Sequence, residues 1–176
     1  MKRLFLLTLS LVACAGAILS IGGSANAAMN RKVPAFEFRG LDEREYRLTD
    51  AQFQGKPLLI TAFTTWNETG RSQAREVAAF HKAHPEVLVI AFVVNALPEA
   101  RDFVRQEGLT FPCYKADSVS RINTTLNRLF ETKKDKTLTF NRLPFAILAD
   151  KERTVRYSTL GLGEAKTLSA EYAKSK

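Results

Sequence analysis

The side chains best placed for chemistry follow a buried apolar run, and they lack sulfur where a redox site would carry it. Residues 58–63 are apolar, and the turn that follows consists of Trp66, Asn67, Glu68, Thr69, Gly70 and Arg71. Cysteines at positions 67 and 70 would form a Cys-x-x-Cys pair at a helix N-terminus, where the helix dipole and free N–H groups stabilise a thiolate. Asn67 and Gly70 cannot exchange disulfides, because exchange needs an attacking thiolate and a second thiol that resolves the mixed disulfide.

The residues that are present at this turn suit the start of a helix. The side-chain oxygen of Asn67 can accept a free N–H of the first turn, and Glu68 suits the positive end of the helix dipole. Gly70 costs about 1 kcal/mol relative to alanine inside a helix, so it is either tolerated near the end or allows another backbone segment to approach closely. We therefore expect a scaffold that keeps the helix without the thiol chemistry.

One cysteine and two histidines are the other candidates for chemistry. Cys113 lies on or beside an expected strand, where an inert buried thiol competes with a peroxidatic or mixed-disulfide cysteine. His81 and His84 are three residues apart, a spacing that can contribute to a metal site, but no further ligands complete one. We interpret them as favourable cations at a helix C-terminus, and we expect no metal and no other cofactor.

The first 27 residues have the pattern of a secretory signal peptide. Two cations precede an apolar stretch over residues 4–21, and Ala-Asn-Ala fits a cleavage site before Ala28. The alternative is a lipoprotein signal that ends before a lipidated Cys14. Both interpretations predict export, and they leave residues 28–176 as a single domain. After cleavage Cys113 is the one remaining cysteine, which excludes an internal disulfide.

The charge of the chain does not indicate a nucleic-acid partner. Lys2 and Arg3 are the only charged residues of the leader, so its removal lowers the formal net charge from +8 to +6. The densest basic run, at residues 133–136, is short and has no aromatic repeat beside it. We interpret the remaining excess as an ordinary solvated surface, with at most weak attraction to an acidic partner or a membrane surface.

Hydrophobic periodicity predicts an α/β fold with a central mixed sheet and helices on both of its faces. Strands are expected at residues 35–41, 45–48, 58–64, 87–95, 111–115, 144–149 and 154–160. Helices are expected at residues 69–84, 98–107, 119–130 and 164–174, with a short turn or helix at 49–55 and a polar loop at 131–142. In the first long helix Ala74, Val77, Ala78 and His81 lie at helical spacing and are expected to share a face.

Two stretches of the chain resemble the extracytoplasmic thioredoxin-like proteins of the TlpA/ResA type, and the similarity spans about residues 33–165. The first stretch is VPAFEFRGLDEREYRLTDAQFQGKPLLITAFTTW, a Pro-led strand, a hairpin and a buried strand that ends in Trp66. The second is RLPFAILADKERTVRYSTLG, in which Pro144 matches the cis-proline that faces the redox site of that family. The resemblance implies a thioredoxin-like fold.

The departures from this family pattern concern its redox site. The family reads Trp-Cys-x-x-Cys-Arg-x-Glu-x-Pro, and here Trp66 and Arg71 match while both cysteines are missing. Gln73 replaces the acidic residue and Arg75 the proline. Because an amide cannot exchange protons as a carboxyl does, these changes agree with a site without redox function.

We therefore expect an exported, redox-inactive module of the bacterial periplasm or cell envelope that binds proteins or peptides or assists assembly. In active relatives an extended chain lies between the turn and the cis-proline segment, here residues 66–71 and Leu143-Pro144, and such strand addition needs no thiol. The expected partner is an envelope protein or extended peptide, with membrane contact only through a lipid on Cys14. The alternatives are a thiol-disulfide oxidoreductase or peroxidase-type redoxin that uses Cys113, and a metal or haem carrier that uses His81 and His84.

Overall fold

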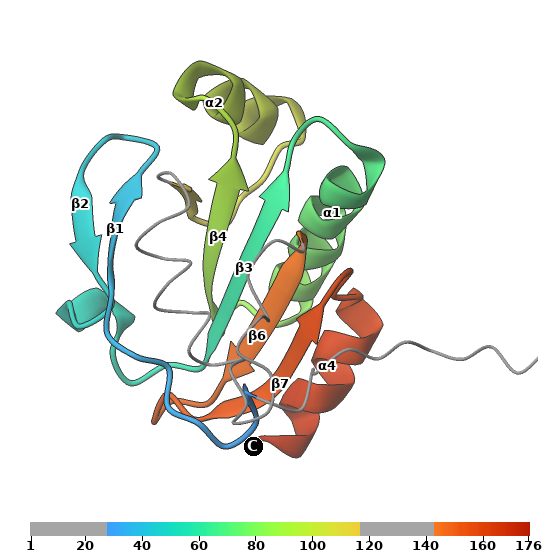
Figure 1. Cartoon of the computed structure of the whole chain (residues 1–176). Coiled ribbons are helices and arrows are strands. Elements are labelled where there is room, and N and C mark those ends of the chain that lie inside the picture. Colours follow the sequence, from blue (N-terminus) through green and yellow to red (C-terminus); the bar gives the residue numbers. More distant parts are fainter. Residues whose placement is uncertain (1–27, 117–142) are drawn as a thin grey trace, which may run out of the picture.

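The part of the chain that the structure describes folds around one mixed β-sheet, with strand order β2-β1-β5-β4-β3-β6-β7 (Figure 1). The structure is a computed structural model, and it describes residues 28–116 and 143–176. The strands are β1 (Glu37–Gly40), β2 (Glu45–Arg47), β3 (Leu58–Thr64), β4 (Leu88–Val94), β5 (Cys113–Lys115), β6 (Phe145–Ala149) and β7 (Val155–Leu160).

Strand direction follows from the connections between the strands. β3, β4 and β5 are parallel neighbours, whereas β1, β2, β6 and β7 pair antiparallel to their neighbours. A crossover helix links β3 to β4 and another precedes β5, as parallel pairing requires. β3 and β4 are long apolar runs because they lie in the interior of the sheet and are covered on both faces.

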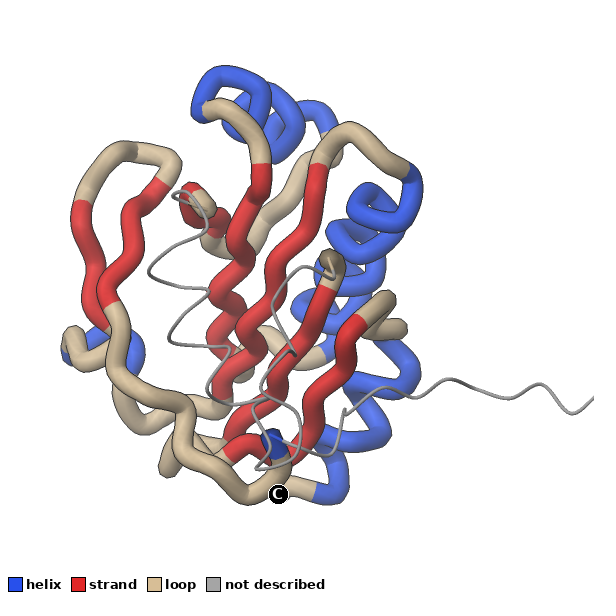
Figure 2. Tube along the Cα trace, in the orientation of Figure 1, coloured by secondary structure: helices blue, strands red, loops and turns tan. Residues whose placement is uncertain are grey.

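Three α-helices of the described chain pack on the same face of the sheet (Figures 1 and 2). They are α1 (Glu68–Ala83), α2 (Leu97–Gln106) and α4 (Ala165–Lys174), and a 3₁₀ turn, η2, covers Ala51–Phe53. Phe80 of α1, Phe103 of α2 and Tyr172 of α4 are buried against this face. In the described residues no helix combines the length and the apolar character that a membrane crossing needs.

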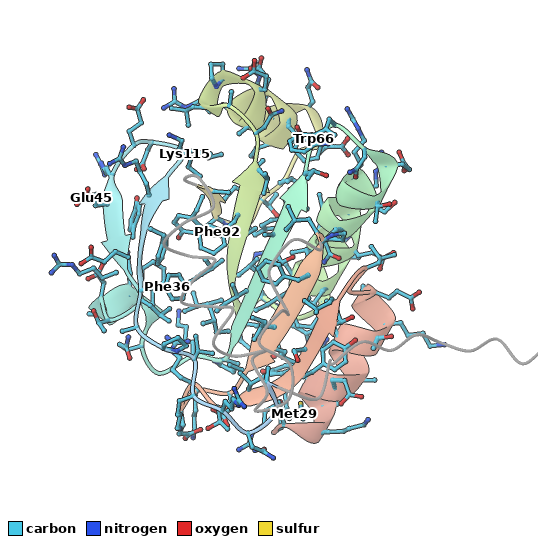
Figure 3. All side chains as sticks on the ribbon, viewed as in Figure 1. Met29, Phe36, Glu45, Trp66, Phe92 and Lys115 are labelled. Atoms are coloured by element: carbon cyan, nitrogen blue, oxygen red, sulfur yellow. The ribbon has the colours of Figure 1, made fainter. Side chains whose placement is uncertain are left out.

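The alternation of β3 side chains divides the core into two layers. Leu59 and Phe63 point to the helical face, whereas Leu58, Ile60 and Ala62 point to the other face. That second layer is rich in aromatic rings: Phe38 lies edge-on to Phe92 with a centroid distance of 5.8 Å and edge-on to Tyr114 at 4.7 Å. Phe36 and Phe92 are labelled in this layer in Figure 3.

The observed elements match most of the predicted ones. β3 has the predicted bounds, and the other strands and helices that lie in the described residues differ from the prediction mainly at their ends. The helix expected at residues 119–130 and the loop at 131–142 lie outside the described residues, as does the leader with Cys14. The expected face of α1 is confirmed, because Ala74 and Val77 are buried in the helical layer, Ala78 packs against it and His81 contacts Phe111 of the same layer. Phe80, which the prediction did not name, is also fully buried there.

Candidate functional site

The connection from β3 to α1 leaves the core abruptly. Thr64 and Thr65 are buried, whereas the next four residues are exposed, and Trp66 has 63% of its surface accessible. Figure 3 shows Trp66 at the end of the sheet where β3 and β4 finish. The Asn95 Nδ2 donates a hydrogen bond to the Thr65 Oγ1, which ties this connection to the turn after β4. Trp66 is therefore an exposed aromatic side chain, and the residue before it is held by a hydrogen bond.

Asn67 forms the N-cap of α1, as the sequence predicts. Its backbone is extended, with φ −127° and ψ 158°, and its Oδ1 accepts a hydrogen bond of 2.7 Å from the Gly70 N–H. The Asn67 carbonyl oxygen accepts the Arg71 N–H at 3.1 Å, and Glu68 occupies the first turn. The position of the first cysteine in redox-active relatives thus holds a residue that stabilises the helix start.

Gly70 lies against the end of β3 with no room for a side chain. A Cβ atom here would be 2.6 Å from the Thr64 Oγ1, 2.8 Å from the Thr64 carbonyl carbon and closer still to its carbonyl oxygen. Of the two interpretations of Gly70, close approach of another backbone segment is confirmed. Any larger residue at the second cysteine position would have to move either α1 or the end of β3.

Gln73 joins the site to the loop after β7. The side chain is fully buried, and its Oε1 accepts a hydrogen bond of 2.7 Å from the Gly163 N–H. Among the described residues its Nε2 has no hydrogen-bond partner. The family pattern identifies Gln73 only as the residue that replaces an acidic one. Its position three residues after Gly70 on the buried face of α1 is the signal that could have identified this contact.

Arg71 and Arg75 connect α1 with α2 through one carboxylate. The Arg71 Nη1 lies 3.3 Å from the Glu107 Oε1, and the Arg75 Nε lies 3.3 Å from the Glu107 Oε2. Arg75 also pairs with Glu68 at 3.2 Å, and the Arg71 guanidinium lies 5.6 Å from the Phe103 ring centroid. The side chain at the position of the family proline thus becomes part of a salt-bridge network beside Trp66.

The predicted second half of the groove lies beside the end of β3. The Leu143–Pro144 peptide bond is cis, as the resemblance implies. Because Ala62 pairs with Phe145 in the antiparallel ladder, Pro144 and Leu143 lie alongside the last residues of β3. Pro144 is buried and Leu143 is half-buried, and the Pro144 carbonyl accepts the Gly161 N–H at 2.8 Å. The structure therefore brings the two segments to the same end of the sheet.

Cys113 lies apart from this turn, on β5. It pairs with Ala91 of β4, which in turn pairs with Thr61 of β3. Cys113 is thus two strands, about 10 Å, away from Thr61 of β3, and Thr61 lies about 10 Å along β3 from the Trp66 turn. Its Sγ contacts the Phe111 carbonyl oxygen at 3.6 Å, and burial raises the pKa of the thiol to about 12. Such a thiol is almost entirely protonated at neutral pH, so it is a poor nucleophile.

His81 and His84 do not meet at one site. The His81 ring lies edge-on to Phe111 with a centroid distance of 6.1 Å, whereas the His84 Nε2 lies 2.9 Å from the Ser169 Oγ of α4. His84 also packs against the Tyr172 ring at 5.1 Å. No cluster of three or more potential metal ligands occurs among residues 28–116 and 143–176. The two imidazoles serve the packing of α1 against its neighbours.

Comparison with solved structures gives the fold of this chain. A DsbF homologue from Corynebacterium diphtheriae is 19% identical with a TM-score of 0.64, and the match covers 81% of this chain and 85% of that one. A thioredoxin-family thiol:disulfide interchange protein from Chlorobium tepidum TLS is 18% identical, with a TM-score of 0.64 and coverage of 82% and 95%. StoA from Bacillus subtilis is 15% identical, with a TM-score of 0.57 and coverage of 80% and 97%. The thioredoxin-like fold is thereby confirmed.

Sequence comparison supplies the family. A search of curated proteins finds no match to this chain. The family model described as Redoxin matches residues 28–173, which includes both segments of the site and all the described strands and helices except the last residue of α4. The chain belongs to the Redoxin family.

Proposed function

We propose that this protein is an exported redoxin that binds an extended protein segment without thiol chemistry. Gly70 is the observation that carries the proposal. At the position of the resolving cysteine the backbone of α1 lies against Thr64 too closely for any Cβ atom. This close approach supports a site that has no second cysteine, because the backbone leaves no space for its side chain. A site of this kind retains surface and shape but has no group that could exchange disulfides.

The surface around the turn is suited to binding. Trp66 and Leu162 are the exposed large hydrophobic residues of the described chain, with 63% and 38% of their surfaces accessible. Trp66 follows β3, and Leu162 lies in the loop that Gln73 holds against α1. Large aromatic side chains such as tryptophan are enriched among residues that dominate binding energy. We propose that an extended segment lies between these side chains and next to Leu143-Pro144.

The leader and one structural neighbour support the proposal of export, and the proposed partner class is chosen to agree with it. The leader predicts passage into the cell envelope, and one structural neighbour is a secreted thiol-disulfide isomerase from Corynebacterium glutamicum. The partner that we propose is an unfolded or extended segment of an envelope protein. Thiol chemistry through Cys113 is the less favoured function, because burial raises the pKa of that thiol to about 12.

Site-directed photocrosslinking tests the proposal in the cell envelope. A photoreactive residue replaces Thr69 in the exposed turn, and the control replaces Lys82, an exposed residue in the last turn of the same helix. We expect protein adducts from position 69 that are weaker after Trp66→Ala and that position 82 does not give. Identical adducts from both positions, or none from position 69, would contradict the proposal.

Two measurements on the purified protein separate binding from catalysis. Trp66 is the only tryptophan of the chain, so its fluorescence reports directly on occupation of the turn. We expect a shift to shorter wavelength when a reduced and alkylated unfolded protein is added, and no shift with a folded one. Insulin reduction and peroxide consumption are measured in parallel on the wild type and Cys113→Ser. Activity that disappears in Cys113→Ser would establish the enzyme alternative instead.

A further inference from the structure

A group of cations gathers at the end of the sheet opposite Trp66. The group, called here the basic corner, consists of Lys32, Lys56, Lys151 and Arg153. Lys56 precedes β3, and Lys151 and Arg153 lie in the turn between β6 and β7. Because Leu58 pairs with Ala149, these two segments begin and end at the same edge of the sheet. The seven residues of β3 separate this edge from the Trp66 turn by about 20 Å.

Backbone contacts hold the basic corner together. The Arg153 Nη1 donates to the Lys56 carbonyl oxygen at 3.4 Å, and the Lys32 Nζ donates to the Glu152 carbonyl oxygen at 2.6 Å. Lys32 also forms an isolated bridge with Thr154. These contacts fix the side chains of Lys32 and Arg153, and they bury part of the Arg153 guanidinium. The three lysine side chains are exposed.

The basic corner has little compensating negative charge. Among the described residues Lys32, Lys56 and Arg153 have no carboxylate within ion-pair distance, and Glu152 lies 3.8 Å from Lys151. The other nearby carboxylate, Asp150, already pairs with Arg156 at 2.8 Å. A cavity of about 370 Å³ is lined by Met29, Arg156, Glu171, Lys174, Ser175 and Lys176. Its three cations pair with Asp150, Glu171 and Glu86, so the excess positive charge lies at the basic corner itself. An acceptor with several negative groups fits such a surface.

The N-terminal end of the domain lies at the same corner. The Asn30 N–H donates to the Val155 carbonyl at 2.9 Å, and the Val33 N–H donates to the Arg153 carbonyl at 2.8 Å. Figure 3 shows Met29 at this end of the molecule and Trp66 at the other. If Cys14 carries a lipid, which is the alternative interpretation of the leader, the chain that leads from this lipid joins the domain next to the basic corner. Together with the positive charge of the corner, this position favours a bilayer over an acidic protein as the occupant.

We propose that the basic corner docks onto a membrane surface that carries anionic lipid headgroups, so that Trp66 points away from the membrane. Each lysine or arginine near an anionic bilayer strengthens partition about fivefold. Because the Debye length is about 10 Å at 0.1 M salt, cations at the other end of the domain contribute little to this contact. The inference does not depend on what the Trp66 turn binds.

Vesicle cosedimentation tests the inference on residues 28–176. Every contact described above lies within this range, which also contains the whole family match, residues 28–173. The probes are vesicles of phosphatidylcholine alone and of phosphatidylcholine with phosphatidylglycerol. The test variant is Lys56→Glu/Lys151→Glu. The control, Arg44→Glu/Arg105→Glu, makes the same change in net charge at exposed positions outside the corner.

We expect binding only to the vesicles with phosphatidylglycerol, and loss of this binding in high salt. The test variant should bind at least tenfold more weakly, while the control stays within about twofold of the wild type. Circular dichroism and the thermal unfolding midpoint show that each variant is folded. Equal weakening in both variants, binding to phosphatidylcholine alone, or no binding to either vesicle would overturn the inference. The last result would leave an acidic protein as the occupant of the basic corner.

Discussion

Replacement of Gly70 by alanine is the sharpest test of the site geometry, because two effects of opposite sign meet there. In an ordinary helix interior this substitution stabilises by about 0.5–1 kcal/mol, since glycine loses more backbone entropy on folding. Here the added methyl group would lie 2.6 Å from the Thr64 Oγ1 and still closer to the Thr64 carbonyl oxygen. Forced overpacking of a buried position typically costs about 1–3 kcal/mol. The steric effect is larger, so the net change should be destabilising.

We expect Gly70→Ala to lower the free energy of unfolding by about 1–2 kcal/mol, the difference between these two effects. Equilibrium unfolding in urea, followed by far-UV circular dichroism and by the fluorescence of Trp66, measures this change. The matched control is Ala79→Gly on the exposed side of the same helix, which should cost about 1 kcal/mol. The control shows that α1 otherwise prefers alanine to glycine.

A stabilised Gly70→Ala protein would refute the reasoning, because the close approach of α1 to β3 would then not exist in solution. The double variant Asn67→Cys/Gly70→Cys tests whether the site can regain a Cys-x-x-Cys pair. The cysteine at position 70 has to fit a side chain larger than alanine into the same space. We expect the double variant to unfold at lower urea concentration than the wild type and to show no disulfide-exchange activity in insulin reduction.

Three further predictions concern a cap, a carboxylate and a thiol. Asn67→Ala removes the acceptor of the Gly70 N–H and should cost about 1 kcal/mol in urea unfolding, whereas Asn67→Asp should restore most of it. Burial of Asp150 would raise its pKa, but hydrogen bonds from the Thr154 N–H and from Arg156 outweigh burial and lower it. Because the pKa is lower in the folded state, the ionised carboxylate stabilises the fold above the ordinary aspartate pKa, and this stabilisation is lost as the pH falls through the folded pKa. In Asp150→Asn the thermal unfolding midpoint should therefore depend less on pH below about 4 than in the wild type. Because the pKa of Cys113 is about 12, a thiol reagent at pH 8 should label it slowly in the native protein and rapidly in urea; equal rates would contradict its burial.

The sequence predicts the central sheet well because its signals are strong. The apolar run of β3 and that of β4 have no competing interpretation in a chain whose intervening segment is amphipathic. The cap at Asn67 is predictable for a similar reason, since its geometry involves only residues three positions apart. Features that depend only on residues close together in the sequence can be predicted from the sequence alone.

Other parts of the site depend on contacts across the fold, which no local pattern contains. Gly163 follows Gln73 by 90 residues, and Glu107 follows Arg71 by 36 residues. Only the packing of α1 against the loop after β7 and against α2 brings these groups together. Likewise the sequence leaves two explanations for Gly70, and the position of the Thr64 carbonyl decides between them.

The residues at the positions that match the redox motif of the TlpA/ResA type form one structural unit. Asn67 caps α1, Gly70 lets the helix approach β3, and Gln73 ties the same helix to Gly163. Arg75 adds a salt bridge to Glu107 where a proline could form none. Because each contact fixes the first turns of α1, they jointly set the position of Trp66 at the start of that helix. A turn whose backbone is already fixed loses less entropy on binding than a mobile one. The four contacts therefore support the proposal that this turn serves recognition rather than disulfide exchange.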